Sequence, residues 1–122
     1  MPASYVDGYV LPLPKKNLAA YRRLALVAAR VWKRHGALDY REAALDDPVG
    51  SFCATFGQLA RARRGETVVF AFVTFKSRAH RDRVNAKVMK DPELTASCDP
   101  DRMPFDVKRM AFSGFKVIAA SR

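Results

Sequence analysis

The sequence predicts an α+β fold in which a four-stranded antiparallel sheet has two helices on one face. Two observations predict this class. Strand-type and helix-type segments alternate in the order β-α-β-β-α-β. The chain has 122 residues, a length that suits one hydrophobic core. We therefore predict a single domain over residues 1–122.

The first half of the chain contains a strand, a helix and a second strand. Residues 5–13 are rich in strand-forming side chains, and prolines close the segment. Residues 15–35 have an apolar stripe at three- and four-residue steps, and Gly36 is a natural end for that helix. Residues 37–45 alternate apolar and polar side chains, which is typical of a half-buried strand.

A connection of about 20 residues, 46–65, separates the two halves. Because so long a structureless loop is unusual in a compact domain, we expect a short helical turn within residues 53–62. The clearest strand of the chain follows at residues 67–75.

The second half repeats the order of the first. Ser77 is a good N-cap for a helix over residues 78–90. Residues 93–107 are expected to be a loop, and residues 108–119 the last strand, with a bulge at Ser113 and Gly114. This β-α-β-β-α-β order is the ferredoxin-like arrangement, in which both helices cover one face of the sheet.

The open face of that sheet predicts self-association. The third strand is apolar on both sides: one face has Val69, Ala71 and Val73, and the other has Val68, Phe70 and Phe72. A strand that is apolar on both faces must be covered on both. We therefore expect a homodimer through the open sheet face, with two such sheets packed face to face about a twofold axis. The alternative is that residues 46–65 fold back over this face.

The chain is strongly basic, with 22 Lys and Arg against 12 Asp and Glu and a formal net charge of +10. Clustered basic residues would indicate nucleic-acid binding. Here they are spread over three segments, and no zinc-finger, RRM or KH signature accompanies them. RNA or another polyanion is therefore a partner that we do not favour.

Other features limit the class of protein. No apolar run approaches the roughly 20 residues of a membrane helix, and no secretory signal is visible at the start. Cys53 and Cys98 are isolated cysteines without zinc spacing. We expect a cytoplasmic protein with reduced thiols, no membrane contact, no metal and no cofactor.

Several segments spread over nearly the whole chain carry a resemblance to one family. They are Tyr5-Val6-Asp7-Gly8, Pro14-Lys15-Lys16-Asn17-Leu18, Tyr21-Arg22, Val31-Trp32-Lys33, His35-Gly36-Ala37-Leu38, Tyr40-Arg41-Glu42, Glu66-Thr67-Val68-Val69-Phe70, Lys76-Ser77-Arg78-Ala79-His80-Arg81-Asp82-Arg83-Val84-Asn85, Met103-Pro104-Phe105-Asp106 and Lys108-Arg109-Met110. With these segments the chain is similar to the YbaA-like proteins of bacteria, a domain-of-unknown-function family placed in the dimeric α/β-barrel class. The resemblance implies this fold and a dimer but no established activity, and residues 48–64 depart from the pattern.

Asp7 and His80 are the candidate catalytic residues. Asp7 lies in an otherwise apolar strand, where a buried carboxylate needs a partner or a proton, and it could act as a general base. The alternative for Asp7 is an ion pair with a strand arginine such as Arg41. His80 is in the first turn of the second helix, where a neutral ring is favoured and could act as a base. The alternative for His80 is a structural histidine.

Arg41 and Tyr40 are the candidate polar contacts of a substrate. Arg41 could hold an anionic group with two hydrogen bonds, and the alternative is a cross-strand ion pair. The expected apolar lining is Trp32, Phe70, Phe72 and Phe105. Proteins similar in fold, the dimeric α/β barrels, often hold a pocket between sheet and helices and include monooxygenases and isomerases. By this analogy we expect a pocket for a small apolar or anionic metabolite, with monooxygenase- or isomerase-like chemistry as the reaction class it implies. A basic RNA-binding module and a non-catalytic interaction dimer are the alternatives.

Overall fold

The computed structural model describes residues 2–48 and 50–121. The strands are β1 (Tyr5–Pro14), β2 (Asp39–Ala44), β3 (Glu66–Phe75) and β4 (Ala111–Lys116). The helices are α1 (Leu18–Arg34), α2 (Phe56–Leu59), α3 (Arg78–Val88) and α4 (Pro92–Ser97). Short 3-10 turns lie at Lys15–Asn17, Pro100–Arg102 and Val107–Arg109. The predicted β-α-β-β-α-β order is confirmed.

The four strands form one antiparallel sheet in the order β2-β3-β1-β4. This is the ferredoxin-like order, because the two central strands come from the two different halves of the chain. The register places Asp7 of β1 between Val73 of β3 and Gly114 of β4. The pairing of β1 with β4 runs on without an inserted residue, so the bulge predicted at Ser113 and Gly114 is wrong.

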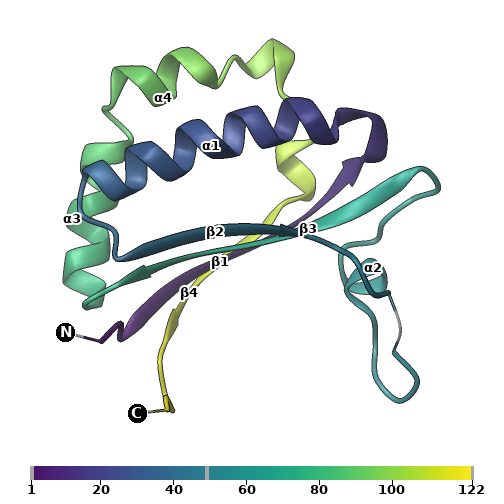
Figure 1. Ribbon diagram of the computed structural model, residues 1–122, viewed down its shortest axis with the longest axis horizontal. Helices are drawn as coiled ribbons and strands as arrows, with labels where there is room; N and C mark the ends of the chain where they lie inside the picture. The colour runs from purple at the N-terminus through teal and green to yellow at the C-terminus, as the bar shows by residue number, and fades with distance from the viewer. Residues whose placement is uncertain (1, 49, 122) are drawn as a thin grey trace.

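Helices α1 and α3 lie on one face of the sheet, and α4 packs against α1 (Figure 1). The larger core cluster joins Val31 and Trp32 of α1 to Val73 and Phe75 of β3 and to the buried valines of α3. The odd-numbered residues of β1 and β3 face this core, as their alternation requires. No helix within residues 2–48 and 50–121 has both the length and the apolar character needed to cross a bilayer.

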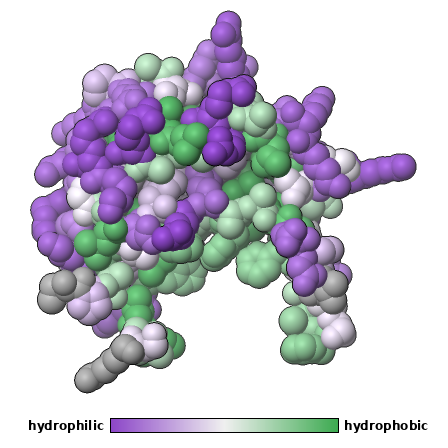
Figure 2. Space-filling view, in the orientation of Figure 1, coloured by the Kyte–Doolittle hydropathy of each residue, from purple (hydrophilic) through white to green (hydrophobic). Residues whose placement is uncertain are grey.

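The opposite face of the sheet is only partly covered. Phe70 of β3 and Phe115 of β4 remain 43% and 56% exposed. The segment that contains α2 lies at one end of this face, where Phe56 contacts Phe70 with ring centroids 5.9 Å apart (Figure 1). A helical turn in this connection is confirmed, and Thr55 caps it. The segment leaves part of this face uncovered, and Figure 2 shows hydrophobic surface beside it.

Several observed boundaries differ from the predicted ones. The first turn of the predicted helix 15–35 is a separate 3-10 turn, and β2 begins at Asp39 rather than at residue 37. The last strand starts only at Ala111, because the preceding residues form another 3-10 turn. The prediction of a structureless loop over residues 93–107 is wrong, since α4 occupies Pro92–Ser97.

Candidate functional site

A pocket of about 410 Å³ lies between the helix-covered face of the sheet and helices α1 and α4. This volume is in the range of small-molecule binding sites. The lining is mostly apolar, and aromatic rings contribute much of it. The lining residues are Tyr9, Leu11, Tyr21, Leu24, Ala25, Ala28, Trp32, Tyr40, Glu42, Ala71, Met89, Leu94, Thr95, Cys98, Met103, Phe105 and Met110.

Glu42 is the acidic residue in this lining. It comes from β2 and points to the same face as Tyr40, because the two are two residues apart on one strand. The Tyr40 hydroxyl donates a 2.5 Å hydrogen bond to Oε2 of Glu42, and the Tyr21 hydroxyl from α1 donates to Oε1. Two phenols from different elements thus hold one carboxylate at the floor of the pocket.

Burial and the Glu42 carboxylate shape the acid–base behaviour of these phenols. Burial first, and the charge of Glu42 second, raise the pKa of Tyr21 and of Tyr40 well above the usual value for a phenol. Burial, with Asp7 and Glu42 nearby, also raises the pKa of Tyr9. These hydroxyls therefore stay protonated at physiological pH and act as hydrogen-bond donors.

Trp32, Tyr40 and Phe105, three of the predicted substrate-binding residues, do line the pocket. The ring centroids of Trp32 and Tyr40 lie 5.7 Å apart. The Phe105 ring packs edge-on against Tyr21, with ring centroids 5.5 Å apart. Such tilted and edge-on pairs fix the positions of the rings. Trp32 is also part of the core cluster, so the same indole both packs in the core and lines the pocket.

Helix α4, with Leu94 and Thr95, and the C-cap residue Cys98 form the outer wall of the pocket. Burial raises the pKa of the Cys98 thiol, so this cysteine is held as a neutral thiol. The helix is held by Asp91, which caps it by accepting a hydrogen bond from the Glu93 amide. The wall is therefore a short helix whose position depends on contacts at its first turn.

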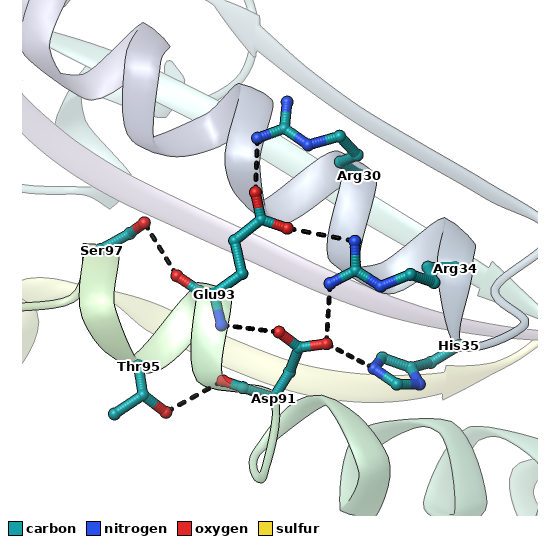
Figure 3. Close-up of polar contacts among 7 residues, drawn as sticks. All are labelled: Arg30, Arg34, His35, Asp91, Glu93, Thr95 and Ser97. Carbon is teal, nitrogen blue, oxygen red and sulfur yellow. Dashed lines mark hydrogen bonds and ion pairs between the residues drawn. The ribbon is translucent and has the colours of Figure 1, made fainter.

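Those contacts join the end of α1 to the start of α4 (Figure 3). Arg34 bonds to Asp91 at 2.8 Å and to Glu93 at 3.1 Å, and Nε2 of His35 lies 2.7 Å from Asp91. Arg30 also pairs with Glu93 at 2.7 Å. The arginine hydrogen bonds, and with them His35, lower the pKa of Asp91. This cluster fixes α4 against α1 and so fixes the pocket wall.

Asp7 is fully buried and is not among the pocket-lining residues. Its Oδ1 lies 3.2 Å from Nε of Arg81, and its Oδ2 accepts a 3.2 Å hydrogen bond from Asn85. The predicted alternative of a pairing with Arg41 is wrong, because Arg81 of α3 is the partner. Burial raises the pKa of Asp7. A raised pKa suits a base, but this carboxylate does not border the pocket.

His80 also lies away from the pocket. Its Nδ1 accepts a 3.0 Å hydrogen bond from the Lys76 amide, and its ring packs edge-on against Phe75. Burial and the nearby Lys76 and Arg83 lower its pKa, which agrees with the expected neutral ring. The ring is also bonded to the backbone of Gly36, so it joins the start of α3 to the turn after α1. These contacts describe a structural histidine.

Arg41, Phe70 and Phe72 point to the open face of the sheet, away from the pocket. The register pairs Arg41 with Phe72 and Phe72 with Gly8, all on the face opposite Asp7. Nε of Arg41 lies 3.0 Å from Asp39 on the same strand, so the predicted ion pair exists within the strand rather than across it. The structure therefore separates the candidate residues into a pocket group and an open-face group.

Glu42 and Tyr21, two of the polar residues of the pocket, were not predicted as site residues. The alternation of Glu42 with Tyr40 along one strand was the signal that places its side chain in the pocket. Helix α4 also had a signal, because Asp91 and Pro92 are a good N-cap and first helical residue. Within the described residues, no group of three or more His, Cys, Asp or Glu could hold a metal ion.

Fold and site together define a ferredoxin-like α+β protein with an aromatic pocket between its sheet and its helices. Residues 4–107 match the family described as "Protein of unknown function (DUF1428)". The chain is 37% identical over 114 residues to the "Uncharacterized protein YbaA" of Escherichia coli strain K12, covering 93% of this chain and 96% of that protein. The Shigella flexneri YbaA matches equally well. The chain belongs to this YbaA-like DUF1428 family, as its motifs predicted.

A solved structure is similar in fold. It is a NIPSNAP family protein with unknown function from Agrobacterium tumefaciens strain C58, with a TM-score of 0.61. The match covers 94% of this chain and 88% of that one, at 15% sequence identity. At that identity the likeness supports the ferredoxin-like fold alone.

Proposed function

We propose that the protein binds a small, mainly apolar organic molecule in the pocket beneath α1 and α4. The observation that supports this most directly is the pocket itself, about 410 Å³ lined by aromatic and aliphatic side chains around one carboxylate. An apolar pocket with a few convergent polar groups is the usual form of a small-molecule site. An anionic ligand is less suitable, because Glu42 is present and the lining has no Lys, Arg or His among residues 2–48 and 50–121.

Binding is a better proposal than catalysis for this pocket. Monooxygenase- or isomerase-like chemistry without a cofactor needs a base that reaches the substrate. Asp7 and His80, the two candidate bases, do not line the pocket. The geometry therefore favours recognition of a ligand over proton abstraction from it.

A matched pair of dyes tests the binding proposal. N-phenyl-1-naphthylamine is neutral and apolar, and 8-anilino-1-naphthalenesulfonate has the same skeleton with an added anion. Trp32 is the single tryptophan of the chain and lines the pocket, so its fluorescence should change when the neutral dye binds. We expect saturable binding of the neutral dye and weaker, salt-sensitive binding of the sulfonate to the basic surface.

Two variants locate the dye. Ala25 lines the pocket, and Ala25→Phe should fill it and abolish binding. Ala19 is exposed on the same helix, and Ala19→Phe should leave binding unchanged. Equal binding by both variants, or no binding by the unaltered chain, would overturn the proposal.

We also propose that the protein is a homodimer through the open sheet face. Phe70 and Phe115 stay exposed there, and a twofold axis would pack each face on its copy. Two segments project on either side of this face, one with α2 and one at the C-terminal end of β4 (Figures 1 and 2). They contain Phe52, 94% exposed, and Ile118, 97% exposed. A second copy between these segments would cover such side chains.

Sedimentation equilibrium tests the dimer. We expect twice the chain mass for the unaltered protein and a monomer for Phe70→Lys. The control is Leu26→Lys on α1, because Leu26 is also exposed, at 48%, but belongs to the helix layer. A monomeric unaltered chain at micromolar concentration would overturn the proposal.

We propose that the protein is cytoplasmic, because its two cysteines are not joined in a disulfide. Cys53 and Cys98 are both free, as is usual for thiols in a reducing compartment. The alternative of RNA or polyanion binding has less support, since Arg30, Arg34 and Arg81 are used in ion pairs with carboxylates. A steep loss of RNA binding with salt would favour that alternative.

A further inference from the structure

The carboxylate at the pocket floor indicates the charge of the ligand. We propose that the pocket selects an organic cation, a protonated primary amine attached to an apolar ring or chain. This inference rests on the proposed binding function and adds the chemical class of the ligand. It depends on three features of the site, which are its charge, its hydrogen-bond geometry and its aromatic rings.

The charge of the site is unbalanced. The Tyr21 and Tyr40 hydroxyls donate to Glu42, so they orient its negative charge without neutralising it. Among the described residues, no Lys, Arg or His forms an ion pair with Glu42, and none lines this pocket. Arg22 lines the adjoining cavity of about 250 Å³, which Glu42 also borders, and forms no ion pair with Glu42 that the structure records. A carboxylate in an apolar pocket favours a cationic partner.

The hydrogen-bond geometry leaves room for a ligand. A carboxylate has about four acceptor positions on its two oxygens. One position on each oxygen of Glu42 is occupied by a tyrosine hydroxyl. The remaining positions can accept from an ammonium group, which has three N–H donors. A neutral hydroxyl or amide ligand could use only one or two of these positions and would not offset the charge.

The aromatic walls also favour a cation. The tilted pair of Trp32 and Tyr40 and the edge-on pair of Tyr21 and Phe105 line the same cavity as Glu42. The faces of aromatic rings attract cations within about 6 Å, and tryptophan attracts them most strongly. The apolar remainder of the ligand would lie against the aliphatic side chains of α1 and α4.

A structural role for Glu42 is the rival explanation. Its two hydrogen bonds join β2 to α1, and that connection by itself would account for the cluster. The two explanations differ in what they predict for ligand charge. If Glu42 is only structural, ligands of equal shape and different charge bind equally.

Three ligands of one shape separate these explanations. Isothermal titration calorimetry at pH 7 would compare cyclohexylmethylamine, cyclohexylmethanol and cyclohexanecarboxylate. We expect the amine to bind about tenfold or more tightly than the alcohol, which corresponds to about 1.4 kcal/mol, and the carboxylate not to bind. The net charge of +10 repels cations at long range, so this preference would have to arise from groups inside the pocket.

The outcomes are distinguishable from failure of the binding proposal. Equal binding of amine and alcohol would overturn the cation inference and leave the pocket as a binding site. Tighter binding of the carboxylate would overturn the inference outright. If none of the three ligands bound and neither dye bound, the proposed function itself would fail.

A matched pair of variants assigns the preference to Glu42. Glu42→Gln keeps the shape of the side chain and removes its charge. This variant should bind the amine only as tightly as it binds the alcohol. Asp39→Asn removes one negative charge from the opposite face of the same strand and should leave the preference intact. An unchanged preference in Glu42→Gln would overturn the assignment. The comparison of the three ligands on the unaltered chain stands even if this variant fails to fold.

Discussion

Trp32 Nε1 donates a 3.0 Å hydrogen bond to Oδ1 of Asn85. Asn85 in turn donates from its Nδ2 to the buried carboxylate of Asp7, at 3.2 Å. The amide thus links a pocket-lining indole of α1 to an ion pair between β1 and α3. This network explains why a polar residue lies on the inner side of α3 among valines, and it makes the amide group indispensable to both of its neighbours.

Removal of the Asn85 side-chain amide should lower the free energy of unfolding. Asn85→Ala leaves the Trp32 N–H without its acceptor and Asp7 without a donor, each in a buried setting. An unsatisfied buried polar group costs about 1–3 kcal/mol, so we expect a loss of about 2–4 kcal/mol in the free energy of unfolding. Urea denaturation measures it. Lys87→Ala, at an exposed position of α3, should change stability by less than about 0.5 kcal/mol. Equal effects would contradict the network.

Asp7 should prove to be structural rather than catalytic. Asp7→Asn removes the buried counter-charge of Arg81, whose other carboxylate partner is the exposed Asp82, and breaking a buried pair typically costs about 3–5 kcal/mol. Combining Asp7→Leu with Arg81→Met should recover most of this loss, because an apolar pair avoids the desolvation penalty. Denaturation curves of both variants check this expectation. A stable Asp7→Asn protein that has lost affinity for N-phenyl-1-naphthylamine would restore Asp7 as a pocket residue.

Most of the fold could be predicted from the sequence. The strand over Glu66–Phe75 was clear because β-branched and aromatic residues fill it, and its two apolar faces matched the register that the structure has. Helix α1 was clear from its apolar stripe. Helix α4 was missed because its six residues are too few to give a periodic pattern.

The site was predictable only in part. Trp32, Tyr40 and Phe105 were found because large aromatic side chains near a predicted core are usually buried between the sheet and the helices. The partner of Asp7 was not found, because an ion pair between β1 and α3 depends on how a helix lies over the sheet. The interaction of Tyr21 with Glu42 was missed for the same reason. Pairing across elements is a property of packing, and local sequence patterns do not report it.

Gly114 should be required where β4 passes over the ion pair. A Cβ at this position would lie 2.3 Å from Nη2 of Arg81 and 2.5 Å from the Tyr5 hydroxyl. Overpacking of this kind costs about 1–3 kcal/mol, so Gly114→Ala should destabilise the protein by that amount. Gly57→Ala is the contrasting change, because its Cβ would meet only Thr55 at 3.7 Å within α2. It should be neutral or slightly stabilising. Thermal melts that show equal shifts for both variants would contradict this prediction.

Glu66 should contribute a pH-dependent share of stability. The Arg109 hydrogen bonds, at 2.7 and 2.9 Å, and the Arg63 amide lower the pKa of Glu66 from 4.5 to about 2. A depressed folded-state pKa means that the unfolded chain takes up the proton first. The contribution is therefore complete above pH 4.5 and is lost as the pH falls towards 2.

Urea denaturation at several pH values tests this share in Glu66→Gln, which lacks the titrating group. We expect the variant to be less stable than the unaltered chain by a constant amount at pH 5–7, and the difference to shrink steadily between about pH 4.5 and pH 2. Asp101→Asn, at an exposed acidic position of a 3-10 turn, is the control and should follow the unaltered chain at every pH. A difference that stays the same down to pH 2 would mean that the carboxylate of Glu66 is not held in its charged form by Arg109.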